Sequence, residues 1–341
     1  MTYAIILLTM TAAYTFYMGY TDGSNAVATS VATRAMRPRI AIILAACVQF
    51  LTVVALYYLS SDLSVAATVG TGLVDAEAYA EITPKVGFVF IFSALFSAII
   101  WSVITYVLKQ PNSTSHTLLG GIIGAGIAAF GFTSIHWLNV FLRIILMIFL
   151  APVISVAIGF LIHKLLMKAA LHAPMGTGKV VRALQIFNTV LISSAIAVND
   201  VQKSIGVYLL MTTLGIDALP ATPPQYIVMI FGAMLSLGIL FGGYKVIVTI
   251  GQKLFKIKPL MSLSSQIATN VIMFSSSALG IPISTGQVIS SGVVGIGISE
   301  RARGVKWITV KKIALGWVVT MPVTILLGAI IYLISKCIIG G

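Results

Sequence analysis

The stretch P-N-S-T-S-H-T-L-L-G-G-I-I-G-A-G, residues 111–126, decides the fold, and it lies between two long apolar runs. It recurs in the second half of the chain as P-I-S-T-G-Q-V-I-S-S-G-V-V-G-I-G, residues 282–297. The copies share the proline, the Ser-Thr pair and three glycines. A proline ends one helix, Ser and Thr suit the N-cap of the next, and glycines let that helix pack closely. Each copy therefore predicts a short helix whose N-terminus lies inside the protein, where its free amides suit an anion.

The composition indicates an all-α polytopic membrane protein. Of the 341 residues, 59% are hydrophobic and 9% charged, whereas soluble domains carry about 25% charged residues. Apolar runs of roughly 20 residues recur along the chain, which is the length of a transmembrane helix. The net charge of +13 does not indicate nucleic-acid binding, because the basic residues lie in the links between apolar runs. Cys47 and Cys337 lie within such runs and are expected to be buried free thiols.

The apolar runs follow the same order in each half of the chain. We expect a first half at residues 1–163, a cytoplasmic linker at 164–182 and a second half at 183–341. Each half contains an interrupted span, a second span, an apolar pair around the P-x-S-T element and a final span. In the first half these are 3–36, broken near Asp22, then 40–59, 86–108 with 111–131, and 136–163, bent at Pro152. In the second half they are 183–213, interrupted at 199–203, then 226–252, 259–299 and 313–335.

Basic residues indicate which links face the cytoplasm. They cluster at 34–39, 164–182, 245–258 and 301–312, whereas the loops 60–84 and 214–225 hold few. The positive-inside rule places the clusters in the cytoplasm and both termini outside. The halves then have opposite orientations, which predicts inverted-topology repeats as in secondary transporters. Each P-x-S-T pair is expected to form a re-entrant helical hairpin that meets the other near the midplane, with two full spans as the alternative.

Two of the eight acidic residues, Asp22 and Asp200, lie inside apolar sequence. A carboxylate at membrane depth is costly and marks a functional site by default. With unwound backbone carbonyls, these two carboxylates would suit Na⁺, or they could relay a proton. The alternative is a structural ion pair, for example between Asp200 and Lys203 at i,i+3. Lys203 could equally contact an anion.

Four hydroxyl side chains are the candidates for anion binding: Ser113, Thr114, Ser284 and Thr285. Helix capping inside the bundle is the alternative role, and the recurrence of the pair in the same frame favours anion binding. His116 could contact the anion or carry a proton, although its counterpart in the second copy is Gln287. Gln49 and Gln266 lie within apolar runs and could serve packing or a site.

These motifs resemble the inorganic phosphate transporter (PiT) family in its bacterial and archaeal form. Residues 19–35, G-Y-T-D-G-S-N-A-V-A-T-S-V-A-T-R-A, resemble the signature G-F-x-D-x-x-N-A-x-A-T-x-x-x-T-R-A. Residues 199–206 resemble N-D-x-Q-K-x-x-G, and the paired elements resemble P-x-S-T-T-H. The resemblance implies a phosphate transporter driven by Na⁺ or H⁺. It implies a substrate site made by Ser113, Thr114, Ser115, Ser284, Thr285, Gln202 and Lys203, and a cation site made by Asp22, Asn25, Asn199 and Asp200, with Asp22 and Asp200 as the Na⁺ ligands.

The sequence departs from the family pattern at several positions. Ile196 and Ala197 replace the usual His-Gly, and Gly286 and Gln287 replace Thr and His. Ser115 stands where Thr is usual. Gln49 and Gln266 occupy positions where animal members carry glutamates. The changes leave the anion cradle intact and bear on cation coupling.

The sequence therefore predicts a non-enzymatic secondary transporter that imports phosphate across the plasma membrane by alternating access at a midplane site. Its partners would be phosphate, Na⁺ or H⁺ and the lipid bilayer, with no other cofactor, no nucleic acid and a possible homodimer. A permease for sulfate or another oxyanion with the same fold is the nearest alternative. An anion channel and an intramembrane enzyme acting on phosphorylated lipids are the alternatives of other classes.

Overall fold

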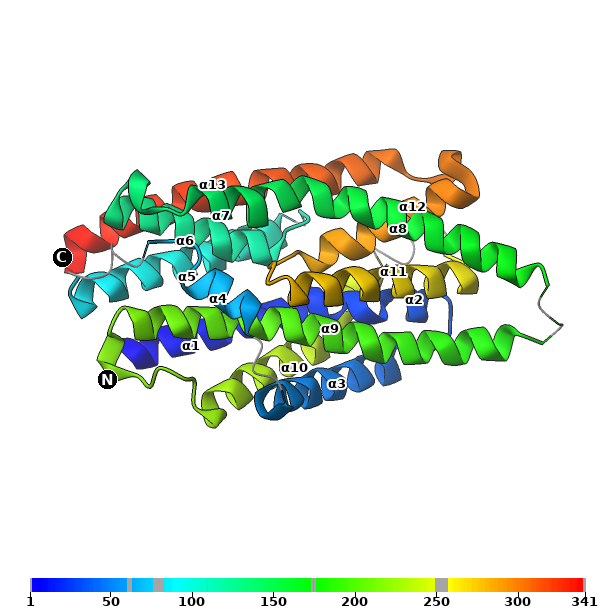
Figure 1. Ribbon diagram of the computed structural model, residues 1–341, viewed down its shortest axis with the longest axis horizontal. Coiled ribbons are helices and arrows are strands. Elements are labelled where there is room, and N and C mark those ends of the chain that lie inside the picture. Colours follow the sequence, from blue (N-terminus) through cyan, green and yellow to red (C-terminus); the bar gives the residue numbers. More distant parts are fainter. Residues whose placement is uncertain are drawn as a thin grey trace.

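The computed structural model describes residues 2–59, 63–75, 82–108, 110–172, 174, 176–248 and 257–339. The predicted loop 60–84 and the predicted span 226–252 thus lie partly outside the described residues. The described chain is helical, and its helices run roughly along the long axis of the molecule (Figure 1). The helices are α1 (Thr2–Met18), α2 (Asn25–Ala32), α3 (Pro38–Leu59), α4 (Ser64–Gly70), α5 (Pro84–Val107), α6 (Thr114–Phe130), α7 (Trp137–Asn139), α8 (Leu146–Ala170), α9 (Gly178–Thr213), α10 (Gln225–Val248), α11 (Pro259–Ala278), α12 (Thr285–Arg301) and α13 (Trp307–Ile339).

Among the described residues, six helical segments are long and apolar enough to cross a membrane. They are Pro38–Leu59, Pro84–Val107, Trp137–Ala170, Gly178–Thr213, Gln225–Gly242 and Trp307–Ile339. Many large apolar side chains on their outer surfaces are exposed, such as Leu51, Phe241 and Leu326. The free thiols of Cys47 and Cys337 are exposed as well, so the expectation that they are buried is wrong. Hydrocarbon is the environment that suits such a surface, so the chain is a multi-pass membrane protein.

The first predicted interruption is a π-helical turn, Gly19–Gly23, between α1 and α2. Gly19 is required there because α10 crosses at close range: a Cβ atom on Gly19 would lie 1.9 Å from the carbonyl oxygen of Leu235. A π-turn adds a residue to the helical repeat and therefore changes the direction of the following side chains. Asp22, within this turn, is buried.

The second predicted interruption is wrong, because α9 is a continuous helix of 36 residues. Its N-D-V-Q-K segment contains neither Gly nor Pro, and its polar side chains find partners without a break in the backbone. Lys203 pairs with Asp200, and Gln202 accepts two backbone N–H groups. A run of polar residues within an apolar segment is therefore not sufficient to predict a break in the helix.

Helix α8 continues through Pro152, where the sequence predicts a bend. A π-helical turn at Val140–Ile145 interrupts the regular α-helix before this proline. A proline leaves the carbonyl four residues before it without its helical N–H donor. Here that carbonyl belongs to Ile148, and the side-chain amide of Gln287 on α12 donates to it at 3.5 Å. The proline therefore leaves the Ile148 carbonyl free to accept a hydrogen bond from a neighbouring helix.

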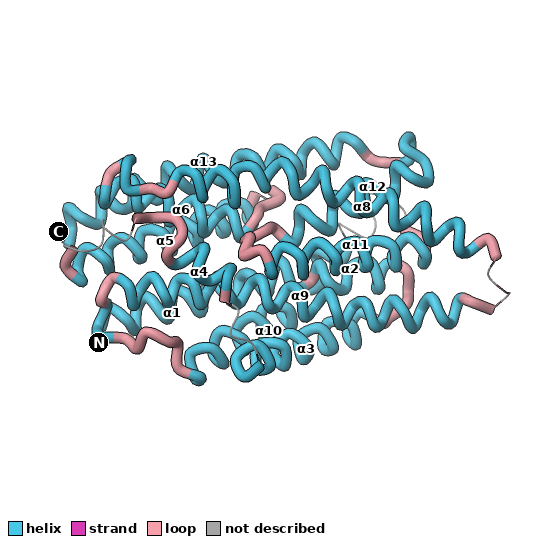
Figure 2. Tube along the Cα trace, in the orientation of Figure 1, coloured by secondary structure: helices cyan, strands magenta, loops and turns pink. Residues whose placement is uncertain are grey.

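The two helical pairs that contain the P-x-S-T elements lie at opposite ends of the molecule. The pair α5 and α6 occupies the end that holds both termini, and α11 and α12 occupy the other end (Figure 1). Their connecting segments meet near the middle, as the pink trace in Figure 2 shows. Each short helix packs against the final helix of the opposite half, α6 against α13 and α12 against α8.

Two connections differ from the sequence expectation. The predicted outer loop 60–84 contains α4, which is largely buried and packs against α9. In the predicted linker 164–182, helix α8 continues to Ala170 and helix α9 begins at Gly178.

The loop after α9 returns to the start of α1, where the Asp217 carboxylate accepts the Ala4 N–H at 2.9 Å. This hydrogen bond holds the pKa of Asp217 below its usual value.

Replacement of Gly124 by alanine should destabilise the fold. A Cβ atom there would lie 1.9 Å from the carbonyl oxygen of Ile325 on α13. Overpacking of this kind costs about 1–3 kcal/mol. Thermal unfolding of the purified protein in detergent measures the effect. The matched control is Gly178→Ala, where the added Cβ meets nothing within 4 Å. Equal unfolding temperatures for the two variants would show that α6 and α13 do not pack this closely.

Candidate substrate and cation site

The N-terminus of α6 lies against the π-turn of the first span. Ser113 is the N-cap, and its side chain accepts the N–H of His116 at 3.4 Å. The hydroxyl of Thr114 donates a hydrogen bond to the Asp22 carboxylate. Tyr14 donates its hydroxyl to the carbonyl of Thr114 at 2.6 Å. The π-turn thus brings a buried carboxylate to the first turn of α6.

The N-terminus of α12 differs in how its hydroxyls are used. Ser284 is the N-cap but makes no side-chain capping hydrogen bond. The hydroxyl of Thr285 is fully buried and has no hydrogen-bond partner among the described residues. Asn25 of α2 lies next to Gly286, with its amide nitrogen 3.7 Å from the place a Cβ would occupy. Capping therefore accounts for Ser113 but not for Ser284.

A direct hydrogen bond joins the two connecting segments. Ser115, in the first turn of α6, donates its hydroxyl to the carbonyl of Ile283 at 2.9 Å. Ile283 precedes the N-cap of α12 by one residue. The N-termini of both short helices are therefore held together in the interior, so their partial positive charges act on a common region.

Asp200 and Lys203 form the buried ion pair that the i,i+3 spacing left open. The ammonium of Lys203 lies 2.6 Å from Oδ1 of Asp200, and both side chains are almost completely inaccessible. The ammonium also lies 3.4 Å from the carbonyl oxygen of Ile283. Asp22 lies near this pair, because its partner Thr114 precedes Ser115, which donates to the same Ile283 carbonyl that Lys203 approaches. With all three ionised, two carboxylates and one ammonium leave this region with a net charge of −1.

The neighbours of Asp200 on α9 contact two different elements. Asn199 donates its side-chain amide to the hydroxyl of Ser277 at 3.3 Å and to the carbonyl of Ile281 at 3.4 Å. Gln202 points away, and its carboxamide oxygen accepts the N–H groups of Val65 and Ala66 at 3.0 and 3.3 Å. Gln202 thereby caps the N-terminus of α4, which leaves only its amide nitrogen for another ligand.

Three buried oxygen atoms close to the joined helix ends have no hydrogen-bond partner among the described residues. They are Oδ2 of Asp200, Oδ1 of Asn199 and Oγ1 of Thr285. Carboxylate, amide and hydroxyl oxygens are the ligands that hard cations prefer, and buried polar atoms are usually paired. The described residues hold no group of three or more His, Cys, Asp or Glu side chains that could bind a metal ion. The three unpartnered oxygens are of the types that bind a hard cation such as Na⁺.

The three polar residues of undetermined role lie in different surroundings. His116 is buried in α6, and its Nδ1 has no partner in the described part of the chain. Gln49 lies over the π-turn, with its amide nitrogen 3.2 Å from the place a Cβ on Gly23 would occupy. Gln266 donates to the hydroxyls of Ser30 and Thr189 at 2.5 and 3.2 Å, and so joins α11 to α2 and α9.

Sequence reasoning missed two participants. The hydroxyl of Tyr14 holds the carbonyl of Thr114, and the carbonyl of Ile283 links α6, α9 and the approach to α12. A tyrosine in an apolar run carries no motif, and a backbone carbonyl is independent of residue type. The proline at position 282 is the only sequence sign of exposed backbone at this point.

Short helices whose N-termini meet beside buried charges, within a multi-pass helical bundle, define a membrane transporter. The chain belongs to the phosphate transporter family, whose profile matches residues 18–328. It is 35% identical to a "Probable low-affinity inorganic phosphate transporter" of Bacillus subtilis, over 98% of this chain and 97% of that one. It is 34% identical to a protein of the same description from Rhizobium meliloti, over 94% and 92% of the two chains. A solved structure described as "The sodium-dependent phosphate transporter" has the same fold, with a TM-score of 0.83 over 99% of this chain and 100% of that chain at 23% identity. These relatives are transporters and not enzymes.

Replacement of Lys203 by methionine should destabilise the protein strongly, because it leaves Asp200 buried without its cation. Loss of one partner of a buried pair costs about 3–5 kcal/mol. The double variant Asp200→Leu/Lys203→Met removes both charges and should recover most of that loss, since apolar replacement of a whole pair is often neutral. Thermal unfolding in detergent compares the three proteins. A single variant as stable as the parent would contradict the buried ion pair.

Proposed function

We propose that the protein is a secondary active transporter that imports inorganic phosphate together with Na⁺. The observation that carries the proposal is the hydrogen bond between Ser115 and the Ile283 carbonyl, which holds two helix N-termini at one place. Free amides and the helix dipoles attract an oxyanion there, and Ser113, Ser284 and Thr285 can donate a hydroxyl to its oxygens. The hydroxyl of Thr114 is already donated to Asp22 and that of Ser115 to Ile283, so these two residues would contribute backbone amides. Ser113, Thr114, Ser115, Ser284 and Thr285 form the anion cradle, with Lys203 as its counter-charge.

The charge balance of the buried region supports cation coupling. With both carboxylates and the Lys203 ammonium ionised, the region carries a net charge of −1, and a phosphate anion makes it more negative. A charge at membrane depth is costly, so cations must enter with the substrate. Asp22, Asn25, Asn199 and Asp200 supply oxygen ligands for them. Na⁺ is favoured over H⁺ because the unpartnered oxygens include an amide and a hydroxyl, which do not take up a proton at neutral pH, and because the similar solved structure is described as sodium-dependent.

Alternating access follows from an arrangement of two inverted repeats. The pairs α5–α6 and α11–α12 act as re-entrant hairpins from opposite sides of the membrane, and their tips enclose the substrate. Each hairpin contacts the final helix of the other half, so movement of one half carries the opposite hairpin with it. A movement of this kind would open the substrate site to one side of the membrane while the hairpin on the other side keeps it closed.

Labelled phosphate uptake into proteoliposomes tests the function. An inward Na⁺ gradient should drive uptake, an inward H⁺ gradient alone should not, and excess sulfate should not compete. Asp22→Asn and Asp200→Asn should each reduce uptake at least about tenfold, the equivalent of 1.4 kcal/mol. Asp217→Asn is the matched control, because it makes the same chemical change at a surface loop and keeps an oxygen for the Ala4 N–H.

Four outcomes of this experiment would change the conclusion. Uptake driven only by H⁺ would show that H⁺ and not Na⁺ is the coupling ion, and uptake of sulfate would show that sulfate is a substrate. Flux that persists without any gradient and exceeds the rates of carriers would favour a channel. Full uptake by both aspartate variants would show that the carboxylates are structural.

Orientation is tested by labelling of single cysteines with a membrane-impermeant maleimide, after Cys47 and Cys337 are replaced by serine. We expect a cysteine at Thr2 to react from outside intact cells and one at Lys168 to react only after the cells are opened. The positive-inside rule gives the physical reason, since Lys168 lies in a basic cluster. Labelling of the Thr2 position only in opened cells would reverse the topology.

A further inference from the structure

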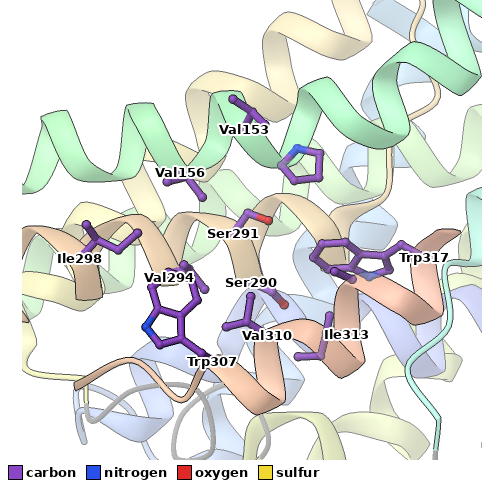
Figure 3. A pocket seen from close by; sticks show the side chains of 12 residues that line it. Val153, Val156, Ser290, Ser291, Val294, Ile298, Trp307, Val310, Ile313 and Trp317 are labelled. Carbon is purple, nitrogen blue, oxygen red and sulfur yellow. The ribbon is translucent and has the colours of Figure 1, made fainter. Parts of the chain in front are cut away.

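An apolar pocket of about 350 Å³ lies between α8, α12 and α13, and it shares no lining residue with the candidate site. In Figure 3, Trp307, Val310 and Trp317 of α13 face Ser290 and Ser291 of α12 across it. The remaining walls are aliphatic, and the polar side-chain groups of the lining are the two serine hydroxyls and the two indole N–H groups. Small-molecule pockets have volumes of about 300–1,000 Å³. The pocket therefore has the size and lining of a site for a hydrocarbon group.

The pocket exists because α12 and α13 pack on different partners. Helix α12 lies tightly on α8, where a Cβ atom on Gly295 would lie 2.1 Å from the carbonyl oxygen of Val156. Helix α13 packs on α6 and α5 and makes little contact with α12. An open space thus remains between the helix that begins at the candidate site and the final helix of the chain.

The pocket opens to the side of the protein that contacts lipid. Val153 and Trp307 line it and are 64% and 46% exposed. Helix α13 has 33 residues and is about 50 Å long, whereas the hydrocarbon core is about 30 Å thick. Its first turns therefore reach the headgroup region, where tryptophan is the preferred residue. Trp307 is in the first of these turns.

Basic residues precede and follow Trp307 in the sequence at this end of the pocket. Arg301, Arg303, Lys306 and Lys311 are exposed, and Lys306 directly precedes Trp307. None of the four pairs with a carboxylate within the part of the chain that the structure describes. The adjacent carboxylate, Glu300, is engaged by Lys258 at 2.6 Å. An anionic group at the mouth of the pocket would thus meet cations without competing acids.

We propose that this pocket binds an anionic phospholipid of the bilayer. One acyl chain fills the space between α12 and α13, and Arg303 and Lys306 bind the phosphate of the headgroup. Basic sites between transmembrane helices on the cytoplasmic side bind anionic headgroups in this way. The bound chain would support α12 where α13 leaves it uncovered, and so steady the helix whose N-terminus carries Thr285.

Native mass spectrometry of the purified protein tests the site, with phosphatidylglycerol and phosphatidylcholine of identical acyl chains as the probes. The parent protein should retain phosphatidylglycerol more tightly. Each basic residue near the membrane surface contributes about fivefold in affinity for a lipid of net negative charge, so Arg303→Gln/Lys306→Gln should weaken phosphatidylglycerol binding by roughly 25-fold. Phosphatidylcholine has the same phosphate but no net charge, so its binding should fall by a much smaller factor. Ala314→Phe, which fills the pocket, should weaken the binding of both lipids.

The matched control is Lys168→Gln/Lys179→Gln, which removes two exposed cations from the same membrane side and leaves the pocket unchanged. An equal loss of phosphatidylglycerol in this control would show general attraction to anionic lipid and overturn the site. Equal binding of the two lipids by the parent protein would also overturn it. A dimer that dissociates in Ala314→Phe, without lipid retention, would assign the pocket to a second copy of the chain. The basic-residue variants change only exposed side chains, so they keep the test valid if Ala314→Phe does not fold.

Discussion

The burial of Asp22, Asp200 and Lys203 in an apolar bundle is the constraint on which the interior depends. These side chains have little contact with solvent, so each charge needs a partner from the protein. Lys203 meets Asp200 and the Ile283 carbonyl, while Asp22 receives the Thr114 hydroxyl. These contacts require that a π-turn, a continuous helix and two helix N-termini meet at one place. The site and the centre of the fold are therefore the same structure.

This arrangement also explains why the hydroxyls of the two P-x-S-T elements are in different states. The first element is tied to Asp22 and to its own N-cap, whereas the second keeps Thr285 without a partner among the described residues. The sequence repeat is symmetric, but the charges around it are not, because Lys203 has no counterpart near Asp22. The hydroxyl groups that remain free to donate to a ligand therefore lie mainly at the N-terminus of α12.

Much of the fold was predictable from the sequence. The order and approximate bounds of the apolar segments, the interruption near Asp22 and the two short helices follow from hydropathy, glycine and proline. The continuous course of α9 did not follow, because side-chain partners from α4 and the Ile283 carbonyl decide it and they are distant in sequence. The same is true of α4: its polar, glycine-containing neighbourhood resembles an exposed loop, and only its packing on α9 explains its burial. For the site, residue types marked Asp22, Asp200 and the hydroxyls, but not the carbonyl that joins them.

The packing of α6 on α13 and of α12 on α8 has a consequence for biosynthesis. Helix α8 is made before its partner α12, and α6 is made before its partner α13. Until those partners are inserted, the glycine-lined face of α6 and the face of α8 around Gly159 must contact lipid or the insertion machinery, where their exposed backbone is poorly covered. The first half therefore cannot reach its final structure ahead of the second. The final packing therefore needs helices from both halves. A product truncated before α12 or α13 would leave these faces uncovered even if every helix that it contains is in the membrane.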